Sequence, residues 1–570
     1  MQWTKVPGDE RATRAPRVTV ATPVAADTAA GRLAATWRAR AAQHEGALAF
    51  VLCAALAWLA QFHHFADFGL YEDDYWFISE AMGKDPSYLL ARLQTAIHLP
   101  QGRPFGFFLP DLLSWVGDKL GGLPAIYLLG FLVVSLNTYL CYRLLRARVP
   151  LAAAAVGAAV FCLFAADTTK IFLTHDFQLQ PSLTFALLSG LAYAARRPAL
   201  AYVLSAGSLL AYENGFLGLF ALPLLLRPWD RRLPRELVRH VLILVGIIAL
   251  AVMVRFLVGE SRATESVGSV GEIVPKVVGS LLIGPPRSLA AMLIMPARAL
   301  PTWDIETAIL GILTLALFGA LLWYLPRPGG RRREALEVGA AGLVMLVLSY
   351  LLAFTHYPPV ALVGRGTSVH LGATLGMAVV GAAVAWLVLQ AWPRLGVAVL
   401  AAYVALAAGY YVIIERDFIT SWHLQRAFWR QVAACCSDVQ DGTVLLYELQ
   451  PDQETTFIFT NSWGDALVLG ETLRFPSEWT SPPRLFSLVD WQSRVQADGA
   501  GLRWWVPAAS WDEHWEPLPQ GNVILLRRTS AGQLERVTGS VEVAGHSLAL
   551  KPPGPAQAWP PAQLYGVLLQ

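Results

Sequence analysis

Charge is what this chain has least of. Only 15% of its 570 residues are Asp, Glu, Lys or Arg, whereas a soluble globular protein carries about 25%. Hydrophobic residues make up 55% of the sequence, and the mean hydropathy is +0.46. The chain lacks the polar surface that a soluble protein of this length needs, so we expect a membrane protein.

Cysteine and net charge are also scarce. Five cysteines are too few for a disulfide scaffold. Cys53, Cys141 and Cys162 lie in apolar runs, where they fit as small buried side chains. The adjacent Cys435 and Cys436 would form a strained bridge with each other. The net charge of +3, spread over short basic clusters, argues against a nucleic-acid partner.

Several catalytic motifs are missing from the sequence. It contains no P-loop, no Gly-rich dinucleotide-binding turn, no zincin helix and no Cys-pair metal site. These absences argue against a transporter that hydrolyses ATP on its own chain, and against a redox enzyme.

Apolar runs are abundant, and a helix that crosses a bilayer needs about 20 apolar residues. We expect spans near 46–66, 123–143, 150–166, 180–195, 238–258, 305–325, 336–354, 371–391 and 396–414. A further apolar stretch, 199–226, is broken by Tyr212-Glu213-Asn214-Gly215 and flanked by basic residues. We expect it to form two short helices that meet at the break, which gives about eleven transmembrane helices.

Lys and Arg in the short loops predict the orientation of the chain. The N-terminal arm and the basic clusters at 142–148, 196–197, 227–239, 327–333 and 394 alternate as cytoplasmic. The outer side then receives 67–122, 167–179, 259–304, 355–370 and the C-terminal region. The prediction is a cytoplasmic arm of residues 1–45, a transmembrane domain of 46–414 and an external soluble domain of 415–570.

The outer segments differ in character. Residues 67–122 are too long for a connector and apolar enough to hold juxtamembrane helices along the interface, and 276–300 is similar. The C-terminal region contains strand-like runs separated by Pro, Gly and Asp, at 443–447, 456–459, 522–526 and 540–543. The predicted fold is therefore an all-α polytopic membrane protein with a β-rich external domain.

The strongest candidate for chemistry is the run Tyr71-Glu72-Asp73-Asp74-Tyr75, just outside the first span. Three consecutive carboxylates beside a membrane repel one another and lose hydration, which raises their pKa values. One of them would then suit a general base or a metal ligand. The alternative is a solvated acidic loop or the N-terminus of an interfacial helix.

With two further motifs, this run resembles the signature of the glycosyltransferase-C superfamily, polytopic enzymes that take sugar from a lipid-linked donor on the outer side. Their acidic pair lies early in a long first external loop with juxtamembrane helices, as Glu72-Asp73-Asp74 does. Gln101-Gly102-Arg103-Pro104 is similar to the Gly-Arg-Pro of the serotype-converting glucosyltransferases. Tyr212-Glu213-Asn214-Gly215 resembles the Lys/Tyr-Glu-x-Gly tip found in the protein mannosyltransferase and aminoarabinose transferase branches.

The resemblance implies roles for the acids. Asp73 would be the catalytic base that takes the proton of an acceptor hydroxyl, and Asp74 would orient the acceptor or assist a metal. Glu72 is a third acid beside the expected pair and leaves the register open. Glu213, in the second motif, would contact substrate.

A lipid phosphate that leaves as an anion needs cationic hydrogen-bond donors. Arg103 and Arg365 are the main candidates because the guanidinium fork suits phosphate, and each has the alternative of an arginine snorkelling to the interface. Arg255 and Arg287 are weaker alternatives.

Histidines and further acids in the outer segments leave the question of a metal open. In the oligosaccharyltransferase branch, the second outer loop supplies acids to a divalent metal, but here it lacks the acid-x-acid spacing. His175 and Asp176 would instead contact the acceptor or cap a helix. His63 and His64 could ligate a metal, although paired histidines at an interface are more often polar edge residues. We therefore expect no metal or other cofactor at the site.

The resulting hypothesis is a glycosyltransferase of the bacterial cytoplasmic membrane. A polyprenyl-phosphate sugar would be the donor, and a cell-surface glycan or lipid would be the acceptor. One alternative is a polysaccharide polymerase or ligase with lipid-diphosphate donors. The other is a lipid-linked glycan transporter or flippase, whose ionisable residues would lie mid-span in repeated halves.

Overall fold

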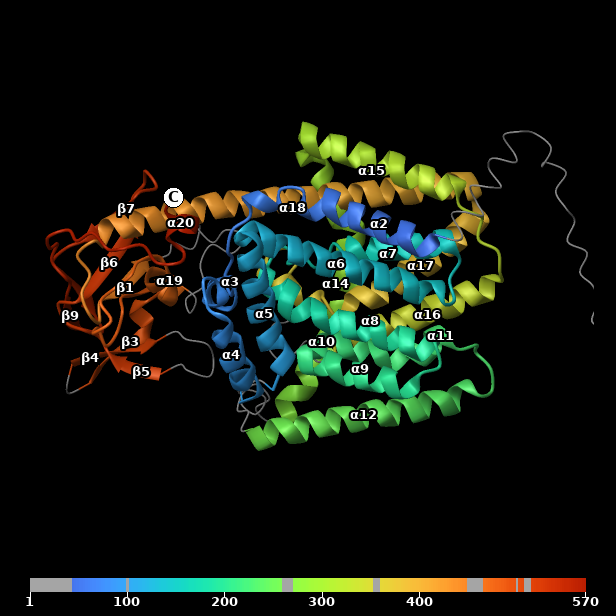
Figure 1. The fold of residues 1–570 in the computed structure, drawn as a ribbon, viewed down its shortest axis with the longest axis horizontal. Helices are drawn as coiled ribbons and strands as arrows, with labels where there is room; N and C mark the ends of the chain where they lie inside the picture. Colours follow the sequence, from blue (N-terminus) through green and yellow to red (C-terminus); the bar gives the residue numbers. More distant parts are fainter. Residues whose placement is uncertain are drawn as a thin grey trace, which may run out of the picture. The chain divides into compact units, whose positions relative to one another are not determined.

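The computed structural model describes residues 44–98, 102–258, 270–351, 359–448, 465–498, 501–506 and 514–570. The chain divides into two units, Met1–Ala49 and Phe50–Gln570, and every helix and strand after α2 belongs to the second. The apolar part consists of packed helices, and the last part of the chain is rich in strands (Figure 1).

The helices follow one another with few long connections in the described part of the chain. In chain order they are α2 (Glu45–Ala57), α3 (Asp74–Phe77), α4 (Pro86–His98), α5 (Pro104–Gly121), α6 (Leu123–Arg146), α7 (Leu151–Cys162), α8 (Gln180–Ala194), α9 (Pro198–Ala211), α10 (Glu213–Phe216), α11 (Leu222–Leu226), α12 (Leu233–Val258), α14 (Val270–Ala299), α15 (Ile305–Tyr324), α16 (Arg332–Leu348), α17 (Ala373–Ala391) and α18 (Pro393–Cys435).

Within the described residues, seven helical segments are long and apolar enough to cross a membrane. They are Glu45–Asp67, Leu123–Arg146, Leu233–Leu257, Ile273–Thr302, Ile305–Tyr324, Ala373–Ala391 and Pro393–Cys435, with shorter apolar helices at Leu151–Cys162, Pro198–Ala211 and Glu213–Leu226. The prediction of a mostly helical chain with long apolar helices and a strand-rich C-terminal region is confirmed, and these helices are compatible with insertion in a membrane. The count of about eleven crossings stays a prediction.

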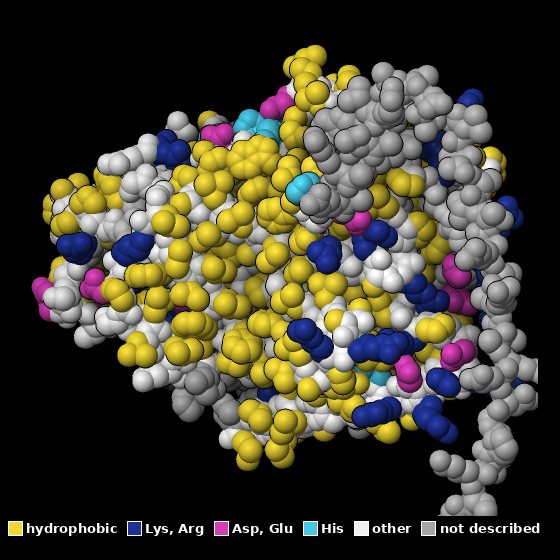
Figure 2. Space-filling view, turned by 45° about the vertical axis from the view of Figure 1, so that its right-hand side comes forward, with side chains coloured by type: hydrophobic (Ala, Val, Ile, Leu, Met, Phe, Trp, Pro, Cys, Tyr) yellow, Lys and Arg dark blue, Asp and Glu magenta, His cyan; other side chains and the backbone are white. Residues whose placement is uncertain are grey.

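The apolar helices differ in how much of their surface the protein covers. Only 11% of the most apolar part of α12 is buried, against 67% for α17 and for α18. Large side chains of α12 and α15, such as Phe256, Leu257 and Ile312, are exposed. Figure 2 shows broad hydrophobic surface on the molecule, with Lys and Arg gathered toward the right of the view. Exposed apolar surface on this scale is typical of helices that face lipid.

Loops that the sequence predicts on the cytoplasmic side contact one another. Arg148, after α6, donates to three backbone carbonyls at the end of α11 and pairs with Glu337 of α16 at 2.5 Å. The Trp386 indole of α17 donates to the Gly329 carbonyl, between α15 and α16. These contacts close one end of the helical region.

Loops predicted on the outer side contact one another in the same way. The Thr174 amide donates to Asp74, which joins the first outer segment to the second. The Thr168 amide donates to the Thr367 hydroxyl at 3.0 Å, which joins the second outer segment to the segment before α17. These two hydrogen bonds join three of the predicted outer segments, 67–122, 167–179 and 355–370.

The longest helix, α18, extends through the predicted boundary at residue 414 without a break and ends at Cys435. Its second half packs against the first outer segment, where the Tyr71 hydroxyl donates to the Phe418 carbonyl at 3.0 Å. Gly69 is required at this contact, because a Cβ there would lie 1.8 Å from the Trp422 ring. The last apolar span and the support for the outer segments therefore share one helix.

The strand-rich region contains a mixed sheet in the order β2-β1-β6-β7. Strand β1 (Val444–Glu448) pairs parallel with β2 (Arg484–Leu488) and β6 (Val523–Arg528), and β6 pairs antiparallel with β7 (Leu534–Val537). Further strands are β3 (Val495–Asp498), β4 (Gly501–Val506) and β5 (His514–Pro517) in a second sheet, and β8 (Ser540–Val543) and β9 (His546–Ala549) in a hairpin.

One core, which includes Phe486, Trp491, Trp504 and Leu525, lies beneath these strands. The short helices α19 (Asp465–Thr472) and α20 (Tyr565–Leu568) complete the region. Predicted strands at 443–447, 522–526 and 540–543 are present with shifts of a residue or two, and 456–459 lies outside the described residues.

Candidate functional site

The three consecutive acids of the first outer segment have different partners, because Glu72 and Asp73 contact Arg365 whereas Asp74 contacts Thr174. Glu72 has a φ of 49°, a left-handed conformation that residues with a side chain rarely adopt. Asp73 follows as the residue before α3, and Asp74 begins that helix. The turn at Glu72 separates the acids, so Asp74 is buried while Glu72 and Asp73 stay partly exposed. A backbone strain of about 1–3 kcal/mol at such a residue is often found at functional sites.

Asp74 joins two outer segments. One carboxylate oxygen accepts from the Thr174 amide at 2.7 Å and from the Thr174 hydroxyl at 2.5 Å, and the other accepts from the Tyr71 amide at 3.2 Å. Burial raises the pKa of Asp74 to about 7, although the hydrogen bonds from Thr174 and Tyr71 act in the opposite direction. Its contacts position the loops around the site.

Arg365 faces the other two acids. It begins the 3₁₀ helix η8 (Arg365–His370), after Gly364 at a φ of 76°. Its Nε lies 2.5 Å from Glu72 Oε2, and its Nη2 lies 3.5 Å from Asp73 Oδ2. Burial raises the pKa of Glu72 to about 8, Arg365 opposes this rise, and the charge of Asp73 adds to it. We call Glu72, Asp73 and Arg365 the acid–arginine set.

The second outer segment places His175 and Asp176 in the π-helix η4 (His175–Leu179), a form that is frequent at functional sites. Asp176 is fully buried, and neither carboxylate oxygen has a hydrogen-bond partner among the described residues. Burial raises the pKa of Asp176 well above its usual range, and the charges of Asp74 and Asp167 raise it further. The position of Asp176 differs from that of a solvated helix cap.

His175 is buried beside the ring of Phe172, at 5.0 Å between centroids. Burial lowers the pKa of His175 well below its usual value, and the nearby charge of Arg365 lowers it further. His175, the first residue of η4, therefore lies close enough to Arg365 for that positive charge to lower its pKa.

Two buried charged residues of this segment were missed by the sequence interpretation. Asp167 accepts from the Thr169 amide and hydroxyl at 3.0 and 2.6 Å, and Lys170 donates to the Cys162 carbonyl at 2.5 Å. Burial raises the pKa of Asp167 and lowers that of Lys170. The polar run 167–170, which lies between apolar stretches, was the feature of the sequence that could have indicated these two residues.

A second charged group forms where the Gly-Arg-Pro motif meets the break between the short helices α9 and α10, which the structure confirms as two helices. The Nε of Arg103 donates to Glu213 at 2.8 Å, and a second guanidinium nitrogen pairs with the other carboxylate oxygen. The Arg103 guanidinium also lies 4.1 Å from the centre of the Tyr212 ring. Arg255, near the end of α12, lies 3.7 Å from Glu213. We call Arg103, Glu213 and Arg255 the arginine–glutamate set.

The π-helix η4 lies near both sets. Gly106 of α5, one turn after Arg103, packs so closely that a Cβ there would lie 2.5 Å from the Ala211 carbonyl and 3.3 Å from the Gln178 side chain. Gln178, which contacts α5, follows His175 by three residues in η4. His175, whose pKa is affected by Arg365, therefore lies within about one helical turn of Gln178. The structure thus brings Glu72 and Asp73 together with Arg365, and Arg103 together with Glu213. Arg287 is exposed on α14.

Ligand atoms in a spacing that suits one metal ion occur elsewhere. Among the described residues, one group of His, Cys, Asp or Glu side chains is close enough to share an ion. It consists of His63, His64 and Glu306. These residues follow α2 and begin α15, and they include none of the acids of the first motif.

The known protein-family models, curated proteins and solved structures offer no match to this chain.

Proposed function

We propose that this protein is a membrane glycosyltransferase. It transfers a sugar from a polyprenyl-phosphate donor to a glycan or lipid acceptor on the outer side of the bacterial cytoplasmic membrane. The observation that supports this most is the acid–arginine set, in which a partly exposed Asp73 is held beside Arg365 at the end of the helical region.

Asp73 is the best general base of the three acids. A base must be ionised before it accepts a proton. The pKa of Glu72 is raised to about 8 and that of Asp74 to about 7, so both hold protons over part of the neutral range. Asp74 is also buried with both oxygens hydrogen-bonded, which leaves no room for an acceptor hydroxyl. Asp73 is partly exposed, and one of its carboxylate oxygens lies 3.5 Å from Arg365 Nη2.

The reaction needs a base and a cationic site at opposite sides of the sugar. The acceptor oxygen forms a bond to the anomeric carbon, its proton passes to Asp73, and the bond from that carbon to the phosphate oxygen breaks. The lipid phosphate leaves with the electron pair and gains negative charge. Hydrogen-bond donors fixed in advance stabilise that charge.

The arginine–glutamate set supplies these donors in the proposal. Two guanidinium groups contact one carboxylate there, so cations outnumber anions in these contacts. Arg103 is fixed by its paired contact to Glu213 and by the Tyr212 ring, which reduces the entropy lost when phosphate binds. Arg365, an expected phosphate ligand from sequence, faces two acids, so we assign it to positioning Glu72 and Asp73.

A lipid-linked glycan transporter is the second candidate. The observation that favours it is the fully buried Asp176, whose pKa is affected by Asp167 and Lys170, because buried ionisable groups are typical of transport pathways. These three residues belong to the outer segment 167–179 and lie outside the long apolar helices. That position favours the transferase.

Asp73→Asn tests the proposal. The variant keeps the size of the side chain but cannot take a proton at neutral pH. We expect transfer to fall about 10²- to 10⁴-fold, with donor binding within a few-fold of the original protein. The measurement is transfer of radiolabelled sugar from a polyprenyl-phosphate sugar to extracted surface glycan, with protein purified in detergent.

The matched control is Asp85→Asn, which removes an exposed acid of the same outer segment and should leave transfer unchanged. Glu72→Gln should have a smaller effect than Asp73→Asn. Full activity in both Asp73→Asn and Glu72→Gln would reduce the acids to a solvated loop and remove the main support for a transferase.

A further inference from the structure

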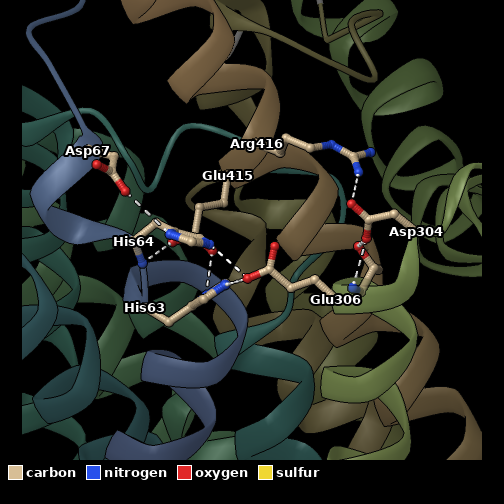
Figure 3. Close-up of polar contacts among 8 residues, drawn as sticks. His63, His64, Asp67, Asp304, Glu306, Glu415 and Arg416 are labelled. Carbon is tan, nitrogen blue, oxygen red and sulfur yellow. Dashed lines mark hydrogen bonds and ion pairs between the residues drawn. The ribbon is translucent and has the colours of Figure 1, made fainter.

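The end of the first apolar helix has a backbone irregularity just before a pair of histidines. Helix α2 passes into the π-helix η1 (Trp58–Phe62), and His63 and His64 follow it directly. Single π turns inside α-helices occur frequently at functional sites. Figure 3 shows both histidines facing Glu306, from the first turn of α15, and Glu415 of α18.

Three ligand atoms converge in this cluster. Glu306 Oε1 lies 2.8 Å from His64 Nε2 and 3.4 Å from His63 Nε2. One nitrogen or oxygen from each of the three residues lies within 4.8 Å of the others. In a tetrahedral zinc site the bonds are about 2.0–2.2 Å, which places ligand atoms about 3.3 Å apart. The observed separations are therefore compatible with a shared ion after small side-chain movements.

The other nitrogen of each imidazole faces a carboxylate. His63 Nδ1 lies 2.7 Å from Glu415 Oε2, and His64 Nδ1 lies 3.4 Å from Asp67 Oδ2. Histidines that bind metals almost always donate their second N–H to such an acceptor, which fixes the tautomer. Protons on both Nδ1 atoms would direct the Nε2 lone pairs toward Glu306.

Glu415 is fixed independently of any metal. It is fully buried, and its Oε1 accepts from the His64 amide at 2.9 Å. The next residue of α18, Arg416, pairs with Asp304 at 2.6 Å, and Asp304 accepts from the Thr307 amide as the N-cap of α15. These contacts hold the first turn of α15, which carries the third ligand, beside the histidines (Figure 3).

We propose that His63, His64 and Glu306 bind a divalent transition-metal ion, best suited to Zn²⁺, with Glu415 and Asp67 orienting the imidazoles. Two imidazole nitrogens and one carboxylate oxygen are a common zinc ligand set, and a fourth position stays open to water. The side chains of His64 and Glu306 are 37% and 48% exposed, so the ion can enter from solvent. The ion links α2 to α15, and the proposal does not depend on sugar transfer.

The test uses the full chain, purified in detergent and freed of metal with a chelator. Zinc chloride is titrated into the protein, and bound zinc is measured by calorimetry and by elemental analysis after desalting. We expect one zinc per chain. His63→Gln and His64→Gln should each weaken binding about 100-fold or more, and Glu415→Gln should weaken it about 10- to 100-fold through loss of the orienting carboxylate.

His423→Gln is the matched control, because His423 is exposed on α18 and should not affect zinc binding. His64 is partly exposed, so its variant should keep the fold even if His63→Gln does not. Zinc binding that is absent from the folded original protein, or equal in all variants, would overturn the proposal and leave a network of ion pairs.

Discussion

The acid–arginine set and the arginine–glutamate set are opposites in composition. In the first, two carboxylates contact one guanidinium group, whereas in the second, two guanidinium groups contact one carboxylate. Both lie near the π-helix η4, which carries His175 next to the first set and Gln178 next to α5. The ion pairs of the described residues join the members within each set and do not join one set to the other.

This separation is informative because a sugar transfer needs opposite kinds of group at its two sides. A general base must be a carboxylate that can accept a proton, and a departing phosphate is favoured by surplus positive charge. The single compensating charge in each set, Arg365 or Glu213, then fixes the geometry of the other two members. The comparison predicts that the sets fail in different ways when their arginines are removed.

The largest effect on donor binding should follow from removal of Arg103 in the arginine–glutamate set. Arg103→Gln removes the paired contact to Glu213 and a charged group that would donate hydrogen bonds to the phosphate. We expect the variant to bind a polyprenyl-phosphate sugar about 100-fold more weakly. Arg365→Gln should leave donor binding within a few-fold while it lowers the transfer rate. Binding of radiolabelled donor to purified protein, and transfer by the same samples, separate the two effects.

Arg298→Gln serves as the control for loss of one positive charge, because Arg298 is exposed on α14. If Arg365→Gln weakens donor binding as much as Arg103→Gln does, the phosphate lies at Arg365, as the sequence alone indicated, and the division between the sets is wrong.

A separate effect, on stability rather than binding, should come from Asp74. Asp74→Ala leaves the Thr174 and Tyr71 amides without their acceptor in a buried position, which should cost about 2–5 kcal/mol of unfolding free energy. Asp73→Asn should change stability little. Thermal unfolding followed by tryptophan fluorescence measures both. Equal midpoints for the original protein and Asp74→Ala would show that Asp74 does not join the loops.

Composition predicted the helical architecture well, because a bilayer imposes length and apolarity on each span. The polar break at Glu213 ended a helix where the sequence indicated. Two features of the fold could not be predicted from the sequence. Helix α18 continues past residue 414 because Phe418, Trp422 and similar side chains bury one face against the outer segments, which follows only from tertiary packing. The π turn at 175–179 has no sequence signature.

The sequence identified most residues of the candidate site, but it did not predict which of them contact one another. The sequence singled out the three acids because they are adjacent. Their different environments depend on the left-handed turn at Glu72, and a residue other than glycine gives no sign of such a turn in the sequence. Arg103 and Glu213 were singled out as separate motifs, and their pairing across 110 positions needed the fold. The histidine pair was noticed, but its third ligand, Glu306, lies 242 residues away.

The smallest expected effect is a change in pH dependence, and it tests the electrostatics of the acid–arginine set. Burial raises the pKa of Glu72 from its ordinary value of 4.5 to about 8. Between these values the folded chain holds a proton that the unfolded chain has lost, so stability is highest below the lower value and falls as pH rises toward the upper one. Glu72→Gln cannot titrate, so its unfolding midpoint should fall less than that of the original protein between about pH 5 and about pH 8.5.

Asp85→Asn should keep the original slope, since Asp85 is exposed. The difference in slope between Glu72→Gln and Asp85→Asn isolates the contribution of Glu72 from the general titration of the protein. A variant whose midpoint falls as steeply as that of the original protein would mean that Arg365 keeps Glu72 ionised, despite its burial, throughout this range. The set would then carry one more negative charge near neutral pH, and Glu72 would compete with Asp73 for the role of base.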